Sequence, residues 1–120
     1  MILHITTKVD WAEALKIGEY RAASLESDGF IHCSTLIQTV DTANIFFKGE
    51  NGLILICIDE EKLKPEYKYE DPSGGGLHDP SVGRLFPHVY GPINLTAVIK
   101  VIDFPTNEEG LFTLPKELEI

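Results

Sequence analysis

Six consecutive apolar residues, Leu53 to Ile58 (LILICI), constrain the fold more than any other stretch of this sequence. Neighbouring side chains of a strand point to opposite faces, so a strand with one wet face alternates apolar and polar residues. This run has no polar face and therefore predicts a central strand that is covered on both sides. The 120 residues are enough for one hydrophobic core and too few for two. We therefore expect a single domain, residues 1–120.

The remaining pattern predicts more strands than helices, with both helices in the N-terminal half. Asp10 and Glu13 resemble a capping box, and Gly18 can end the helix that follows, Trp11–Ile17. Thr35 and Gln38 form a second such box, which predicts a helix that ends near Gly49. The expected fold class is α+β, with a small split core of antiparallel or mixed β-sheet and two helices. The other expected strands are Ile2–Thr6, Gly29–Cys33, Tyr67–Glu70, Arg84–Tyr90 and Leu95–Phe104.

The charge of the chain excludes some classes of partner. The formal net charge is −9, so the overall field repels nucleic-acid backbones and anionic lipid surfaces. No apolar run approaches the roughly 20 residues that span a bilayer, and the N-terminus lacks the pattern of a secretory signal. We expect a cytoplasmic protein whose partner is a small molecule. Cys33 and Cys57 lie in apolar runs and are expected to be buried free thiols.

Three predicted strands each carry one histidine within an alternating polar face. His4 shares a face with Thr6, His32 with Phe30, and His88 with its aromatic neighbours Phe86 and Tyr90. If these strands are neighbours in the sheet, the three imidazoles converge on one cleft. Histidine suits proton transfer near neutral pH, so His4, His32 and His88 are the candidate catalytic residues.

The candidate ligand-binding residues surround those strands. Ser34 precedes a predicted helix and either caps it or helps to hold an anion at its N-terminus. Tyr20 and Tyr90 can stack on a flat ring, and Arg84 can neutralise a phosphate. The full candidate set is Tyr20, Ser24, Phe30, Ser34, Phe86, Tyr90 and Arg84.

Other residues have weaker claims on a functional role. Glu70 is the nearest carboxylate to the histidine strands, although an exposed strand end explains it equally well, and Trp11 is expected in the core. Residues 71–83 combine three consecutive glycines, Gly74 to Gly76, with His78 and two prolines. This composition predicts a long surface loop, of a kind that often covers a site.

Together the motifs LHIT, Trp11, GFIHCS and FPHVYGPI resemble the family known as domain of unknown function 952, from Leu3 to about Val101. That family consists of small, mostly bacterial proteins. It is also distantly similar to the ADP-ribosyltransferase fold, in which two facing sheets form a split cleft that holds NAD.

The second resemblance implies roles for particular residues. His4 would hydrogen-bond a ribose hydroxyl, the Phe30–Ser34 strand would line the cleft, and Tyr20 or Tyr90 would stack on nicotinamide. His88 and Tyr90 would occupy the later-strand position, where transferases often carry a glutamate. The motif FPHVYG contains no glutamate, which argues against transfer of ADP-ribose to proteins.

Three functional hypotheses follow from this sequence. The first is binding or processing of NAD or a related nucleotide, with NAD as the substrate or ligand and, if turnover occurs, a transferase or glycohydrolase activity. The second is a zinc-dependent hydrolase with a three-histidine site, although no HxH or HxxxH spacing occurs. The third is a small-molecule-binding module without turnover. The first is favoured because the family motifs extend over nearly the whole chain.

Overall fold

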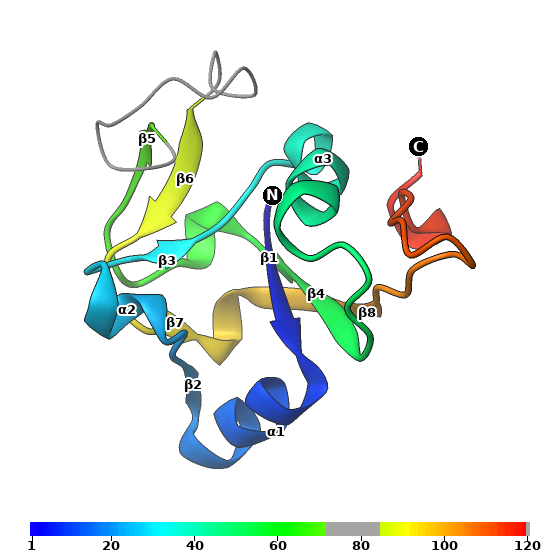
Figure 1. The fold of residues 1–120 in the computed structure, drawn as a ribbon. Coiled ribbons are helices and arrows are strands. Elements are labelled where there is room, and N and C mark those ends of the chain that lie inside the picture. Colours follow the sequence, from blue (N-terminus) through cyan, green and yellow to red (C-terminus); the bar gives the residue numbers. More distant parts are fainter. Residues whose placement is uncertain (72–84, 120) are drawn as a thin grey trace.

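Strand β4 (Leu53–Ile58) is the centre of the largest sheet (Figure 1). It pairs antiparallel with β1 (Ile2–Thr7) on one side and with β8 (Val98–Asp103) on the other. All six residues of β4 are buried, so the central strand predicted from LILICI is confirmed. The structure is a computed structural model that describes residues 1–71 and 85–119.

The two faces of this sheet contact different parts of the core. Ile56 and Ile58 belong to one buried cluster, whereas Leu55 and Cys57 belong to a second cluster that contains Phe104 and Phe112. Both cysteines are free and buried, as predicted. Burial raises the pKa of the Cys57 thiol to about 11 and also raises that of Cys33, so both are protonated at neutral pH.

A second three-stranded sheet has the order β3 (Ile31–His32), β6 (Phe86–Val89), β5 (Tyr67–Glu70), with antiparallel neighbours. A two-stranded sheet joins β2 (Glu19–Tyr20) to β7 (Ile93–Asn94). An isolated bridge between Leu3 and Ser34 connects the segment after β3 to the outer edge of β1. Every pairing among the described strands is antiparallel. Of the two expected arrangements, antiparallel or mixed, the described strands therefore form the antiparallel one.

Helix α1 (Lys8–Ile17) begins three residues earlier than predicted. The prediction that Asp10 and Glu13 form a capping box at its start was therefore wrong. Thr7 is the N-cap, and its hydroxyl accepts a hydrogen bond from the backbone N–H of Asp10 at 3.0 Å. Asp10 lies in the first turn, where a carboxylate interacts favourably with the helix dipole. The helix ends at Gly18 as predicted, in the left-handed conformation with φ of 96°.

The described residues form three α-helices rather than the predicted two, all in the N-terminal half. The missed helix is α2 (Ser24–Ser27), a single turn without a side-chain cap that would mark it in the sequence. Helix α3 (Leu36–Phe46) has the predicted capping box of Thr35 and Gln38. Short 3₁₀ turns cover Glu60–Lys62, Leu95–Ala97 and Lys116–Leu118. Because of the second turn, β8 begins at Val98 and not at Leu95 as predicted.

Figure 1 shows α3 on one side of β1 and the β3–β6–β5 sheet on the other. Leu3 and Ala43 belong to the same buried cluster, so α3 packs on this strand. Within the described parts of the chain, no helix has the length and apolar content to cross a membrane. The α+β class is confirmed, and the ADP-ribosyltransferase likeness stays a prediction.

Gln38 connects α3 to the strand that carries His88. Its side-chain oxygen accepts the backbone N–H of Thr35 at 2.9 Å, and its Nε2 donates to the Leu85 carbonyl at 2.7 Å. Replacing Gln38 with alanine should lower the free energy of unfolding by about 2 kcal/mol, because two backbone groups lose their partners. The neighbouring exposed Ile37 is the control, and Ile37→Ala should change stability by less than about 0.5 kcal/mol. Urea denaturation measures both, and equal effects would contradict the role of Gln38.

Candidate functional site

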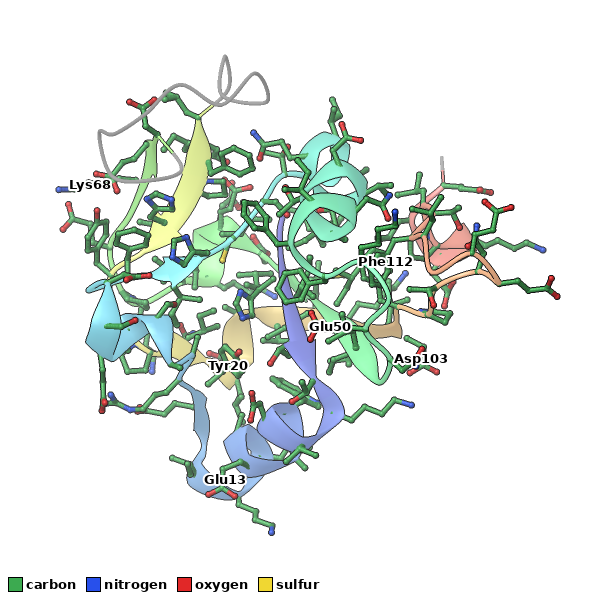
Figure 2. All side chains as sticks on the ribbon, in the orientation of Figure 1. Glu13, Tyr20, Glu50, Lys68, Asp103 and Phe112 are labelled. Atoms are coloured by element: carbon green, nitrogen blue, oxygen red, sulfur yellow. The ribbon has the colours of Figure 1, made fainter. Side chains whose placement is uncertain are left out.

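A cavity of about 670 Å³ runs along the outer edge of β1. Five consecutive residues of this strand, Leu3 to Thr7, contribute to its wall, because the only described strand that pairs with β1 is β4 and the bridge to Ser34 covers the outer edge at Leu3 alone. Figure 2 shows Tyr20 and Glu50, which both line the cavity, on the two sides of this strand. Flat rings supply much of the wall, from His4, Tyr20, His32, Phe46, Phe47, Phe86 and His88.

His4 is held by hydrogen bonds at both ring nitrogens. Its Nδ1 lies 2.6 Å from the carbonyl oxygen of His32, and its Nε2 lies 2.8 Å from the hydroxyl of Tyr20. A carbonyl can only accept, so Nδ1 carries the proton of the neutral ring and Nε2 accepts from Tyr20. The same tyrosine oxygen lies 2.9 Å from Thr6 Oγ1.

Burial keeps this network neutral. It lowers the pKa of His4 to about 4, because the charged ring would lose its water, and it raises the pKa of Tyr20 to about 12. The side chain of His4 is only 8% exposed and has both nitrogens engaged. His4 therefore joins β1 to the His32 backbone and to Tyr20 at the cavity wall.

His88 has a different environment. Its Nδ1 lies 3.0 Å from Glu70 Oε1, and the hydroxyl of Tyr90 donates to the same carboxylate oxygen. The hydrogen bond from Tyr90 and, to a smaller extent, the one from His88 lower the pKa of Glu70. Burial lowers the pKa of His88. Glu70 is thus ionised beside a neutral His88. Although the His88 ring lines the cavity, its Nε2 is buried and has no hydrogen-bond partner within residues 1–71 and 85–119.

Aromatic packing fixes the position of the His88 ring. His32 and His88 are direct cross-strand partners, and their ring centroids are 5.4 Å apart in an edge-on arrangement. Phe30 stacks on His88 with centroids 4.0 Å apart and 17° between the planes. The His32 ring is about half exposed, and its Nε2 lies 2.9 Å from Asp28 Oδ2.

The structure places the candidate residues in three groups. Those that line the cavity are His4, Tyr20, Ser24, His32, Ser34, Phe86 and His88. Phe30 and Tyr90 are not in the wall: Phe30 stacks on His88, and Tyr90 bonds Glu70. Arg84, His78 and the Gly74–Gly76 stretch lie outside the described residues.

Two of the sequence interpretations need correction. Ser34 does not cap α3, because Thr35 is the N-cap and the buried hydroxyl of Ser34 lies 2.9 Å from Thr39 Oγ1. Glu70 is more than an exposed strand end, since it bonds both His88 and Tyr90. Trp11 packs against the core as expected.

Sequence reasoning missed the second half of the cavity wall. Thr42 and Phe46 lie in the last turns of α3, and Phe47 follows as its C-cap. The carboxylates of Asp10 and Glu50 also line the cavity. Among these residues only Phe47 carries a signal in the sequence, because Leu36, Val40, Ala43 and Phe47 recur at helical spacing, and that spacing indicates packing in the core. The described lining contains these two carboxylates and neither lysine nor arginine. The wall therefore favours neutral or cationic ligand groups.

The described residues do not supply a metal centre. Across 1–71 and 85–119, no group of three histidine, cysteine, aspartate or glutamate side chains is placed to hold a metal ion. His4 also has no free ring nitrogen for a metal, since its two nitrogens face a carbonyl and a tyrosine hydroxyl. The three-histidine zinc hypothesis thus finds no ligand set at this cavity.

Comparison of the sequence with models of known protein families shows to which family the chain belongs. The model of the family described as "Protein of unknown function (DUF952)" matches residues 5–101. The chain belongs to this family. The resemblance predicted from LHIT, GFIHCS and FPHVYGPI is thereby confirmed at the family level. Among curated proteins, none matches this chain.

Solved structures of one other protein are similar to nearly the whole chain. The crystal structure of protein CC0527 from Caulobacter crescentus has a TM-score of 0.82 and 29% sequence identity, covering 99% of this chain and 98% of that one. A double mutant of CC0527 gives the same TM-score at 28% identity, with the same coverage. The solution structure of CC0527 gives 0.72 at 28% identity, covering 98% of this chain and 95% of that one.

Proposed function

We propose that this DUF952 protein binds NAD or a related nucleotide in the cavity along β1, through the ring-and-ribose part of the ligand. The observation that carries the proposal is the cavity itself, about 670 Å³ and walled by seven aromatic or imidazole rings. Pockets for small molecules and cofactors have this size and combine an apolar wall with a few polar groups. Flat rings stack well on such walls.

The charge of the wall determines which part of the ligand enters. Asp10 and Glu50 repel phosphate groups, and no described basic side chain in the wall offsets them. The diphosphate of NAD therefore stays at the mouth in water, while the cationic nicotinamide ring and its ribose enter. Nicotinamide riboside, which lacks the phosphates, should bind at least as tightly as NAD.

Filling the cavity tests the proposal. Thr42 lies on α3 and lines the cavity, whereas the exposed Ile45 lies on the same helix outside the lining. Thr42→Trp should weaken binding of NAD and nicotinamide riboside at least tenfold, because the indole occupies the space of the ligand. Ile45→Trp should bind both as wild type does. Isothermal titration calorimetry measures the affinities, and circular dichroism checks that both variants are folded.

Two outcomes of that experiment count against the proposal. The first is absence of heat with either ligand at millimolar concentration in the wild-type protein. The second is equal affinity in the two tryptophan variants, because the ligand would then lie elsewhere. Release of free nicotinamide, followed by proton NMR in the same samples, separates turnover from binding alone.

A further inference from the structure

We propose that Glu70 is a positioning residue that fixes His88 with its proton on Nδ1, so that Nε2 accepts a hydrogen bond from a hydroxyl or amide N–H of the bound ligand. This inference deepens the proposed function and rests on it for the ligand. The inference assigns a role to Glu70. It also predicts that the protein binds only ligands that can donate a hydrogen bond to His88 Nε2.

The tautomer follows from the contacts of the ring. Ionised Glu70 can only accept, and His88 Nδ1 lies 3.0 Å from its Oε1, so the proton of the neutral imidazole lies on Nδ1. Tyr90 donates to the same oxygen and keeps the carboxylate in place. The cross-strand partner of His88 on β5 is Lys68, two residues before Glu70, so the β5–β6 register sets this contact.

The remaining nitrogen is an unfilled acceptor. His88 is 1% exposed, and its Nε2 is buried without a hydrogen-bond partner among the described residues. An unsatisfied buried acceptor costs stability, and native proteins rarely retain one without a use. The ring that carries it lines the cavity, so a donor group of a ligand there is the partner that is missing.

Two neighbouring rings limit how a ligand can approach the His88 ring. Phe30 is buried and stacks on His88, so it holds one face of the ring. His32 packs edge-on and is about half exposed, which makes it the neighbour that is freest to rotate away. A ligand that displaces the His32 ring gives Nε2 its donor.

The first experiment needs no ligand. Long-range proton–nitrogen NMR of ¹⁵N-labelled protein at pH 7.5 should show His88 protonated on Nδ1 in wild type and in the control Tyr69→Phe, whose exposed hydroxyl bonds Glu60. Glu70→Ala should move much of the proton to Nε2, whereas Glu70→Asp should restore part of the Nδ1 form. An Nε2-protonated His88 in wild type, or an unchanged tautomer in Glu70→Ala, overturns the proposal.

The second experiment separates a ligand-binding role from a structural one. His88→Phe keeps a flat ring against Phe30 and removes the unsatisfied nitrogen. Its melting temperature should equal or exceed that of wild type, while its affinity for nicotinamide riboside falls at least tenfold. Glu70→Ala should also bind at least several-fold more weakly, whereas Tyr69→Phe, which alters an exposed residue of β5 that bonds Glu60 instead, should bind as wild type does.

The outcomes of the second experiment distinguish the two proposals. Unchanged affinity in His88→Phe overturns the acceptor role while the nucleotide proposal stands. A lower melting temperature with unchanged affinity shows His88 to be structural. If wild type binds neither nicotinamide riboside nor NAD, the nucleotide proposal fails. The proposed hydrogen bond from the ligand to His88 Nε2 then fails with it.

Discussion

Replacing Tyr20 with phenylalanine should lower the free energy of unfolding by about 3 kcal/mol, although the change deletes a single oxygen atom. The hydroxyl lies between His4 Nε2 at 2.8 Å and Thr6 Oγ1 at 2.9 Å, and all three side chains are buried. Its loss leaves two polar groups unpaired, at a cost of about 1–3 kcal/mol each. Chemical denaturation followed by circular dichroism measures the change.

The control for this prediction is Tyr69, which is exposed and whose hydroxyl lies 3.3 Å from Glu60. Tyr69→Phe should change stability by less than about 0.5 kcal/mol, since water replaces the lost contact. A Tyr20→Phe protein as stable as Tyr69→Phe would show that the His4–Tyr20–Thr6 network contributes little.

The free energy of unfolding should fall by about 3 kcal/mol between pH 6.5 and pH 4 because of His4 alone. An unfolded histidine takes up a proton near pH 6.5, whereas burial lowers the pKa of folded His4 to about 4. Between these values the unfolded chain binds more protons, so stability is lost as the pH falls. Each tenfold difference in proton affinity contributes roughly 1.4 kcal/mol, which gives the stated total.

Comparison with a non-titrating variant isolates this effect from the carboxylates that titrate in the same range. His4→Gln should show a flatter dependence of stability on pH over that interval, whatever its stability at pH 7.5. Denaturation midpoints at half-unit pH steps provide the comparison. Parallel curves for the two proteins would mean that His4 is not held neutral by burial.

Elements that depend on residues close together in the sequence were predicted correctly. The strand Leu53–Ile58 follows from an apolar run, and α3 follows from the Thr35–Gln38 box with apolar residues at helical spacing. The start of α1 was missed because Thr7 and Asp10 are both good N-caps, and the antiparallel pairing of β1 through Thr7 decides between them.

The site depends on pairings that a single sequence does not reveal. Period-two alternation places Phe86 and His88 on one face of β6, but nothing local shows that His32 is the partner of His88 across the sheet. The Glu70–His88 contact links residues 18 positions apart and needs the β5–β6 register. Phe46 and Glu50 reach the cavity only because α3 packs beside β1.

Mapping of NAD binding by NMR is the most direct test of the central claim, that the cavity along β1 is a nucleotide site. On titration of ¹⁵N-labelled protein with NAD, chemical-shift changes should concentrate on cavity residues such as Thr6, Ser24, Thr42 and His88. Changes centred on the exposed residues of β8, such as Ile99 and Val101, or no changes at millimolar NAD, would contradict the claim.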